Sequence, residues 1–242
     1  FTGPIFSPQG ACASGNHAIA IGARMIRDGD CDFVLAGGVD ACLIPEIIQG
    51  FANMLATISV SPQDRAYNDP SQASRPFSID RKGIVLSEGA GAVVLAADEA
   101  VSNYRLAPKA EVMGIGWTSD AYHFTLPNHN TIIRAIHAAI DDAGLVSDDI
   151  QYVNAHGTST PKGDATEIKC LRTVFGQRLP KIPISSNKSQ LGHTLGASAA
   201  IEAALGIEAM RLGLLLPTIN HIPDPEFSDI DVVPNAVRRQ CY

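Results

Sequence analysis

The chain has 242 residues, of which 45% are hydrophobic and 18% charged, a composition typical of a globular protein rather than a disordered or fibrous one. The formal net charge is -7 and the 18 lysines and arginines are scattered, so nucleic acid is not expected as a partner. No apolar run approaches the roughly 20 residues that span a bilayer, and the first ten residues do not resemble a signal peptide. We therefore expect a soluble protein with no membrane partner.

The five cysteines form an odd set without a Cys-x-x-Cys pair. They are Cys12, Cys31, Cys42, Cys170 and Cys241. This pattern argues against a disulfide framework and against a zinc site made of thiolates. It fits a reducing compartment, and we expect the protein to be cytoplasmic.

The first predicted helix starts at Cys12, since small and apolar residues then recur near helical spacing until Arg27 and a glycine stop. Residues 32–41, DFVLAGGVDA, are predicted to be a short buried strand because the apolar run is continuous. Residues 50–59 are predicted to be helical. Residues 61–83 contain three prolines and several turn formers, which predicts a long loop of the kind that is often functional.

Two strands and a helix are predicted next. The strands are residues 89–100 and 109–117, and the helix runs along residues 132–143 with Asn130 or Thr131 as its cap.

A short strand over residues 150–155 is predicted to end at His156. Asp164 and Glu167 then match an Asp-x-x-Glu version of the capping box, which predicts a helix that continues to Phe175.

The last predicted elements are a strand at residues 181–187 and a helix over residues 191–213. That helix is so rich in alanine and glycine that it must pack closely against a neighbour. Because strands alternate with helices, we predict a layered α/β fold whose central sheet is covered on both faces.

Cys12 is the candidate nucleophile. Unpaired backbone N–H groups at a helix start favour the thiolate and lower the pKa of a cysteine from its ordinary value of about 8.5. The neighbours of Cys12 are small, so a substrate carbonyl can approach, and the Cys12 N–H can stabilise an oxyanion. For the other four cysteines we favour the role of a buried, inert side chain.

Two histidines have settings that suggest chemistry. His156 ends an apolar strand and opens the run HGTSTPKGD, whereas His193 follows a strand, between glycines, five residues after Lys188. Strand ends are where sites form in such folds, although a structural histidine with one hydrogen bond fits the spacing equally well. The remaining histidines are expected to be bystanders; they are His17, His123, His129, His137 and His221.

Metal and nicotinamide cofactors are poorly supported. No histidine has an i,i+4 partner or an H-E-x-x-H context, which zinc enzymes show. The run EGAGAVVL lacks the third glycine of a dinucleotide fingerprint and leads into a strand. We expect no metal and no cofactor.

Six motifs occur in the order expected of one family: GACASGNHAI, LAGGVDA, RPFSIDRKGIVLSEGAGAVVLA, SDAYHFT, VNAHGTSTPKGDATE and SSNKSQLGHTLGASAAIEA. Between about Gly3 and about Val233 the chain resembles a β-ketoacyl-[acyl carrier protein] synthase of the elongating type, in the thiolase superfamily. The resemblance implies an α/β fold of the thiolase-like layered α/β/α/β/α type with mixed five-stranded sheets. It divides the chain into residues 1–100, the end of the N-terminal half, and residues 101–242, most of the C-terminal half.

The resemblance also implies a reaction. Cys12 takes an acyl group from acyl carrier protein, and malonyl carrier protein then loses carbon dioxide to give a carbanion that attacks the Cys12 thioester. His156 and His193 donate hydrogen bonds to the malonyl thioester carbonyl as charge accumulates there. Lys188 supports the histidines by hydrogen bonding and charge. No cofactor is required.

Further residues match family positions that surround this chemistry. Thr158 and Thr160 match positions that bind the pantetheine arm, and Phe51 matches an aromatic near the acyl pocket. Asp164 and Glu202 match buried acidic positions of the supporting network, although helix capping is a sufficient explanation for Asp164.

Two family segments are not found in this sequence: an N-terminal half before the cysteine and a C-terminal Gly-Phe-Gly-Gly-Thr-Asn segment that carries an oxyanion donor. We therefore expect a fragment, or one piece of a split enzyme, that is poorly active alone and works as a homodimer or with a complementing chain. The loss of one oxyanion donor typically costs roughly 100 to 1000 fold in rate.

Three alternatives remain open. A non-catalytic condensing-enzyme subunit is less well supported, because Cys12, His156 and His193 are all present. A cysteine thioesterase that uses Cys12, one histidine and Asp164 leaves Lys188 and the second histidine unexplained. A thiolase uses a second cysteine near its C-terminus, but Cys241 has no matching surroundings. Acyl chain length, and a fatty-acid or a polyketide pathway, are not determined by the sequence.

Overall fold

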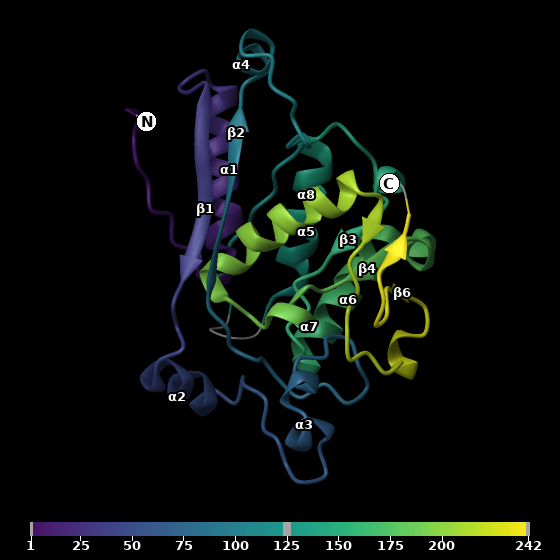
Figure 1. The fold of residues 1–242 in the computed structure, drawn as a ribbon. Helices are drawn as coiled ribbons and strands as arrows, with labels where there is room; N and C mark the ends of the chain where they lie inside the picture. Colours follow the sequence, from purple (N-terminus) through teal and green to yellow (C-terminus); the bar gives the residue numbers. More distant parts are fainter. Residues whose placement is uncertain (1, 123–126, 241–242) are drawn as a thin grey trace. The chain divides into compact units, whose positions relative to one another are not determined.

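The computed structural model describes residues 2–122 and 127–240, so His123 and Cys241 lie outside the described residues (Figure 1). The chain forms two compact units. Unit 1 comprises Phe1–Ile48, Leu86–Val112 and His193–Leu212, and unit 2 comprises Gln49–Val85, Met113–Gly192 and Gly213–Tyr242. Within the described ranges, no helix is both long and apolar enough to cross a membrane.

Unit 1 is built on an antiparallel strand pair. β1 (Phe33–Asp40) pairs with β2 (Gly89–Ala96) along its whole length, and helices α1 (Ser14–Arg27) and α8 (Ser198–Arg211) pack on the pair (Figure 1). The first predicted helix is thus confirmed, although its α-helical part begins two residues after Cys12, at Ser14. The strands predicted at residues 32–41 and 89–100 are confirmed as β1 and β2. However, residues 98–100 are helical, and the pair is exposed on one face, which corrects the predicted buried strand and the predicted sheet covered on both faces.

Glycines allow α8 to approach its neighbours closely. A Cβ on Gly15 of α1 would lie 2.7 Å from the Ala200 nitrogen, and one on Gly91 of β2 would lie 2.6 Å from the Ile201 nitrogen. Both distances are shorter than any real Cβ contact, so only glycine fits at these two positions. The prediction that the alanine- and glycine-rich helix packs closely is confirmed.

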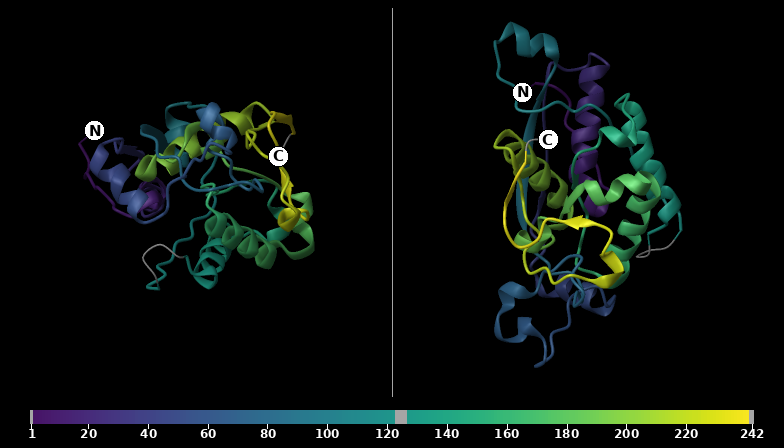
Figure 2. Two further views of the ribbon diagram at one scale, coloured as in Figure 1. Left: turned by 90° about the horizontal axis from the view of Figure 1, so that it is seen from below. Right: turned by 90° about the vertical axis from the view of Figure 1, so that its right-hand side faces the viewer.

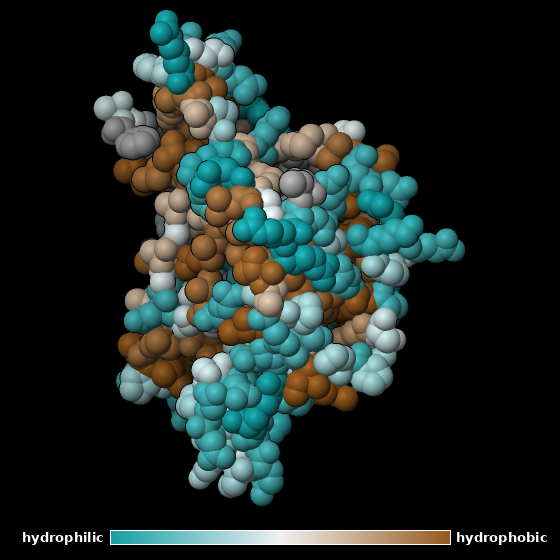
Figure 3. All heavy atoms as spheres, turned by 45° about the vertical axis from the view of Figure 1, so that its right-hand side comes forward, coloured by the Kyte–Doolittle hydropathy of each residue, from teal (hydrophilic) through white to brown (hydrophobic). Residues whose placement is uncertain are grey.

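The opposite face of the β1–β2 pair is apolar and exposed. Leu35, Val39 and Val94 keep 58%, 75% and 65% of their surface accessible. They alternate with residues that face the helices, as the two-residue period of a strand requires. Exposed apolar side chains are not confined to this sheet, and the space-filling view shows several separate apolar patches (Figure 3).

Unit 2 contains a parallel sheet in the order β3–β4–β6. Its strands are β3 (Val153–Asn154), β4 (Pro183–Ser185) and β6 (Asp231–Val232). Helices α5 (His129–Asp142) and α6 (Pro161–Phe175) lie side by side (Figure 2). The core of the unit includes Phe77, Ile168, Ile182 and Ile184, all fully buried. A further antiparallel pair joins β5 (Leu214–Leu215) to β7 (Arg238–Arg239).

The other elements are short. The helices are α2 (Pro45–Asn53), α3 (Arg65–Asn68), α4 (Asp98–Asn103) and α7 (Lys188–Leu191). The 3-10 turns are Ala11–Ala13, Pro70–Gln72, Ser147–Asp149, Gly176–Lys181, Leu195–Ala197 and Pro225–Phe227.

The strand predicted at residues 109–117 is wrong. This segment has no ladder partner and instead runs along α5, where a Cβ on Gly116 would lie 2.0 Å from the Ala135 carbonyl oxygen. The segment therefore packs on a helix instead of pairing with a strand. The helix predicted at residues 50–59 is α2, which starts earlier, at Pro45, and ends at Asn53.

Two details of the helix ends also differ from the predictions. Asn128 caps α5 by accepting a hydrogen bond from the Asn130 nitrogen at 3.0 Å, so neither Asn130 nor Thr131 is the cap. The helix predicted over residues 191–213 is interrupted at Gly192, and α8 begins only at Ser198. The long loop at residues 61–83 is confirmed, with only α3 and one 3-10 turn inside it.

Candidate active site

Cys12 lies in the 3-10 turn Ala11–Ala13, directly before α1. The Ser14 hydroxyl donates to the Ala11 oxygen at 2.7 Å and accepts from the Gly10 nitrogen at 3.0 Å, which fixes the turn. Cys12 is half-buried and is not part of a disulfide. The thiol is therefore held at the end of a helix where backbone N–H groups lack helical partners.

His193 is buried, with 2% of its surface accessible. Its Nδ1 atom lies 2.9 Å from the Ser198 hydroxyl, which also contacts the Thr194 hydroxyl at 3.0 Å. The His193 oxygen accepts from the Ser87 nitrogen at 3.0 Å. Because Ser198 engages Nδ1, the orientation of the imidazole is fixed.

Unit 1 brings the Cys12 turn and the segment after His193 together. The turn Ala11–Ala13 contacts the turn Leu195–Ala197. A Cβ on Gly196 would lie 3.7 Å from the Ala11 oxygen, and the Gly196 nitrogen donates to Asp40 Oδ2 at 3.1 Å. Glu202 lies further along α8 and is half-buried, rather than fully buried as the resemblance implied.

In unit 2, His156 and Lys188 follow the carboxyl ends of neighbouring parallel strands. β3 pairs with β4 through Asn154 and Ser185, and the two site residues follow these by two and three positions. Carboxyl ends of parallel strands meet at one edge of a sheet, which is where sites form in such folds. The strand predicted before His156 is confirmed, as is the one at residues 181–187.

Hydrogen bonds tie the two loops together beyond the strands. The Ser186 hydroxyl donates to the Gly157 oxygen at 2.7 Å, and the Asn154 amide donates to Asn187 Oδ1 at 2.8 Å. Gly157 has a φ of +34°, and a Cβ there would lie 2.6 Å from the Ser186 Cβ, so this position requires glycine.

The electrostatics of this edge favour a neutral imidazole. Surrounding protein atoms keep water from the His156 imidazole, which disfavours its charged form and lowers its pKa from the ordinary value of 6.5. The positive charge of Lys188 lowers this pKa further. His156 keeps an exposed surface, whereas Lys188 is 2% accessible. A neutral imidazole at pH 7 still carries one N–H that can donate to a substrate oxygen.

Thr158 and Thr160 place their hydroxyls 3.1 Å apart, within hydrogen-bond distance. Thr158 is buried and Thr160 is half-buried. Ser159, between them, is fully buried and has a φ of 68°, which is unusual for a residue other than glycine. Phe51, the predicted acyl-pocket aromatic, lies half-buried in α2.

The predicted capping box of Asp164 and Glu167 is wrong. α6 starts at Pro161, so both residues lie inside the helix. Asp164 is fully buried, and its Oδ2 accepts from the Phe77 nitrogen at 2.9 Å. Burial raises the pKa of Asp164 to about 7.

Glu167 is a residue that the sequence did not assign to the site. Its Oε1 accepts from the His156 nitrogen at 2.7 Å and its Oε2 from the Gly157 nitrogen at 2.8 Å. The carboxylate therefore fixes the backbone that carries His156. Nothing in a spacing of eleven residues signals this contact.

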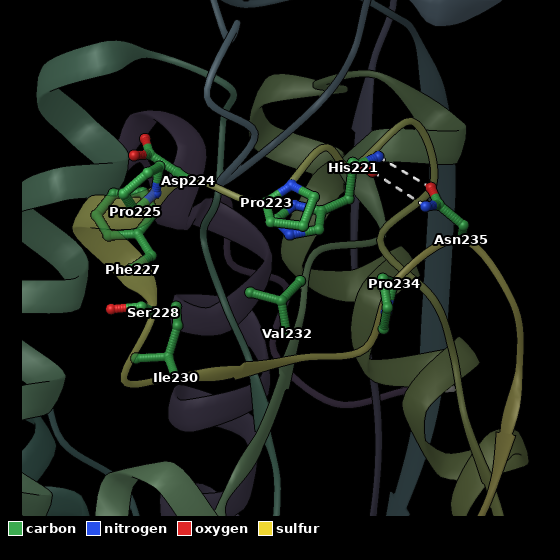
Figure 4. Close-up of a pocket in the computed structure, with 10 residues that line it drawn as sticks. All are labelled: His221, Pro223, Asp224, Pro225, Phe227, Ser228, Ile230, Val232, Pro234 and Asn235. Carbon is green, nitrogen blue, oxygen red and sulfur yellow. Dashed lines mark hydrogen bonds between the residues drawn. The ribbon is translucent and has the colours of Figure 1, made fainter.

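The cysteines that the sequence predicts to be inert differ in burial. Cys42 and Cys170 are buried, but Cys31 is half-buried, which corrects its assignment as a buried side chain. Within the described chain, no three histidine, cysteine or acidic side chains converge as a metal site requires. A pocket of about 520 Å³ in unit 2 is lined by His221, Asp224 and Phe227 among others and includes none of the predicted site residues (Figure 4).

The structure thus distributes the predicted residues over both units. Unit 1 carries Cys12, His193 and Glu202. Unit 2 carries Phe51, His156, Thr158, Thr160, Asp164 and Lys188.

Comparison with solved structures identifies the fold. A type II polyketide ketosynthase, AntDE, solved in complex with its acyl carrier protein AntF, superimposes with a TM-score of 0.93 at 33% identity and covers 99% of this chain. A β-ketoacyl synthase from Burkholderia phymatum gives a TM-score of 0.86 at 38% identity and covers 95%. The chain covers 58% and 54% of these two proteins. The predicted thiolase-like fold is confirmed, although no sheet among the described residues has more than three strands.

Family comparison gives the same result for the sequence. Residues 1–100 match the model of the β-ketoacyl synthase N-terminal domain, and residues 109–221 match that of the C-terminal domain. The chain belongs to the β-ketoacyl synthase family. It is 39% identical over 239 residues to 3-oxoacyl-[acyl-carrier-protein] synthase 2 of Staphylococcus aureus and 39% identical to nodulation protein E of Rhizobium meliloti. It spans 57% and 56% of their lengths.

Proposed function

We propose that this chain carries the condensing site of a 3-oxoacyl-[acyl carrier protein] synthase. The reaction is a decarboxylative Claisen condensation of malonyl-[acyl carrier protein] with an acyl chain held on Cys12. It belongs to fatty-acid or polyketide synthesis. The acyl carrier protein partner is supported by the AntDE ketosynthase, which was solved with its own carrier protein. A homodimer or a complementing chain, and a cytoplasmic location, are part of the same proposal.

The chemistry has two stages. In the first, the Cys12 thiolate attacks the acyl thioester, the carrier thiol leaves, and the acyl group remains as a Cys12 thioester. In the second, the malonyl thioester loses carbon dioxide, and the electron pair of the broken carbon–carbon bond becomes an enolate. The enolate carbon attacks the Cys12 thioester, the Cys12 thiolate leaves, and 3-oxoacyl carrier protein is released.

The histidines act in the second stage. His156 and His193 each donate an N–H to the thioester oxygen that gains negative charge when carbon dioxide departs. Lys188 acts by its charge and hydrogen bonding, which keep His156 neutral. Thr158 and Thr160 bind the pantetheine arm, and Phe51 contacts the acyl chain. Asp164 and Glu202 support the network.

The observation that carries this proposal is the emergence of His156 and Lys188 from two hydrogen-bonded parallel strands. A second supporting observation is that the turn of Cys12 packs on the turn after His193. A thioesterase would need neither Lys188 nor a second histidine, so this arrangement favours condensation.

The test follows carbon dioxide release and 3-oxoacyl product separately, with malonyl and acyl carrier proteins as substrates. Cys12→Ala should abolish the product but keep carbon dioxide release, since decarboxylation does not use the thiol. His156→Ala and His193→Ala should each lower carbon dioxide release by about 100 fold, the usual cost of one oxyanion donor. Cys31→Ala and His137→Ala are the matched controls and should match wild type. Product from Cys12→Ala would refute the proposal.

A further inference from the structure

Residues 74–83, here named the anchoring segment, lie in the long proline-containing loop and yet are largely buried. Ser74, Arg75, Phe77 and Ser78 have accessible fractions of 7%, 0%, 0% and 0%. Loops normally stay at the surface because buried backbone needs hydrogen-bond partners. The partners of this segment include residues of the candidate site.

The buried side chain of Arg75 cross-links the loop. Its guanidinium binds Asp64 in a bidentate manner, with Nη1 to Oδ1 at 3.0 Å and Nη2 to Oδ2 at 2.7 Å. Nε donates to the Asp80 oxygen at 2.8 Å, and Nη1 also donates to the Gln72 oxygen at 3.1 Å. One planar cation thus joins three points of the loop, which is the geometry that guanidinium suits best.

The first link to the site goes to the turn of Thr158 and Thr160. The Arg75 nitrogen donates to the Ser159 hydroxyl at 3.2 Å, and the Gly83 nitrogen donates to the Ser159 oxygen at 2.8 Å. Ser159 is therefore held through both its side chain and its backbone. This explains how it keeps a left-handed φ that glycine would adopt more easily.

The second and third links go to Lys188 and to α6. The Ser74 hydroxyl donates to the Lys188 oxygen at 2.6 Å, in a buried contact. The Phe77 nitrogen donates to Asp164 Oδ2 at 2.9 Å. Neither Ser74 nor Ser159 was assigned a role by the sequence.

We propose that Ser74 and Ser159 are positioning residues, through which the anchoring segment fixes the Lys188 backbone and the Thr158–Thr160 turn. The inference deepens the proposed function and rests on it. Because the two links reach different parts of the site, their loss should affect different kinetic constants.

Each variant has its own expected signature. Ser159→Ala should raise the KM for malonyl carrier protein about 5 to 10 fold with little change in kcat, because the threonines bind a part of the substrate that does not react. Ser74→Ala should lower kcat for carbon dioxide release about tenfold with little change in KM, because Lys188 acts on the reacting group. Ser74→Thr keeps the hydroxyl and should restore most of kcat.

The matched control is Ser78→Ala. Ser78 is a buried serine of the same segment, and its hydroxyl bonds to Asp80 at 2.6 Å and accepts from the Ile222 nitrogen at 3.0 Å, outside the site. It should lower the thermal midpoint of unfolding without changing either kinetic constant. If Ser159→Ala does not fold, Ser159→Gly serves instead, because glycine adopts the required φ without strain.

The experiment measures kcat and KM for all variants, together with the thermal midpoint and a Cys12→Ala arm. A change mainly in KM for Ser159→Ala, together with a change mainly in kcat for Ser74→Ala, supports the inference. Two results would overturn the inference: wild-type kcat and KM in both variants, or a loss of both constants that follows the fall in thermal midpoint. In either case, product that depends on Cys12 would leave the proposed function standing. Product that persists in Cys12→Ala would refute the proposed function, and the inference with it.

Discussion

The carboxylate of Glu167 accepts a hydrogen bond from the backbone nitrogen of His156, at 2.7 Å, and so joins α6 to the end of β3. The second carboxylate oxygen takes the next backbone N–H, that of Gly157. One side chain thus satisfies two consecutive donors that follow the strand. The backbone position of His156 therefore depends on α6 as well as on the loop that contains it.

Replacing Glu167 should therefore affect both stability and His156. In Glu167→Ala both N–H groups lose their acceptor, and we expect a loss of about 1 to 3 kcal/mol in the free energy of unfolding. Glu167→Gln keeps one acceptor oxygen and should lose less. Urea unfolding measures the effect, with exposed Glu111→Ala as the control. Equal stability of wild type and Glu167→Ala would contradict the assigned contact.

Asp164 should make stability depend on pH. Its pKa is about 7 in the folded chain and 3.8 ordinarily, so the folded state binds the extra proton between those values. Its contribution to stability is therefore fully present below pH 4 and is lost as the pH rises through 7, by up to about 4 kcal/mol. Asp164→Asn should remove this contribution, so the stability of the variant relative to wild type should increase between pH 4 and pH 8. Parallel pH profiles of unfolding free energy in the two proteins would disprove the assignment.

The protonation state of His156 gives a third prediction. Because burial, and then the Lys188 charge, lower its pKa from 6.5 to about 3, the imidazole should remain neutral at pH 6. Nitrogen NMR of the labelled protein should show the two ring-nitrogen resonances of a neutral imidazole at pH 6, identified by their disappearance in His156→Gln. Lys188→Met should move the titration of these resonances to higher pH. A His156 ring that titrates near 6.5 in wild type would be the opposite result.

The buried pair of Arg75 and Asp64 should be sensitive to replacement. Arg75→Met removes the four hydrogen bonds of a buried guanidinium but leaves Asp64 paired with Lys82 at 2.6 Å, so it should cost about 1.5 to 3 kcal/mol in the free energy of unfolding. The exposed pair of Arg211 and Glu208 provides the comparison, and Arg211→Met should cost less than about 1 kcal/mol. Chemical denaturation of both variants decides between these magnitudes, and similar costs at the two pairs would count against the burial of Arg75.

Two glycines associated with α8 should respond in opposite directions to alanine. Gly91→Ala places a Cβ 2.6 Å from the Ile201 backbone and should destabilise the protein, whereas Gly206→Ala meets no atom within 4 Å and lies inside the helix. Gly206→Ala should therefore stabilise by about 0.5 to 1 kcal/mol. The thermal midpoints of both variants provide the measurement. Stabilisation by Gly91→Ala would mean that α8 does not approach β2 as described.

The sequence predicts the elements whose pattern is local. The helix along Ser14–Arg27 follows from apolar spacing, and β1 follows from a continuous apolar run. The start of α2 was missed although Pro45 and Glu46 are typical of a first turn. The strand expected at residues 109–117 failed because strand pairing depends on a neighbour that spacing does not reveal.

The candidate site divides in the same way. Cys12, His156 and His193 stand out because each lies beside glycines at the end of an element. Glu167, Ser74 and Ser159 could not be found by spacing, since each acts through a backbone group that is distant in sequence or through a buried loop. Pro161 at the start of α6 was a signal against the capping box at Asp164.

The central claim is that Cys12 accepts an acyl group. Its most direct test is intact-protein mass spectrometry after incubation with a long-chain acyl carrier protein, on wild type, Cys12→Ala and the half-buried control Cys31→Ala. We predict an added acyl mass on wild type and Cys31→Ala and none on Cys12→Ala. Acyl mass that persists in Cys12→Ala would contradict the account.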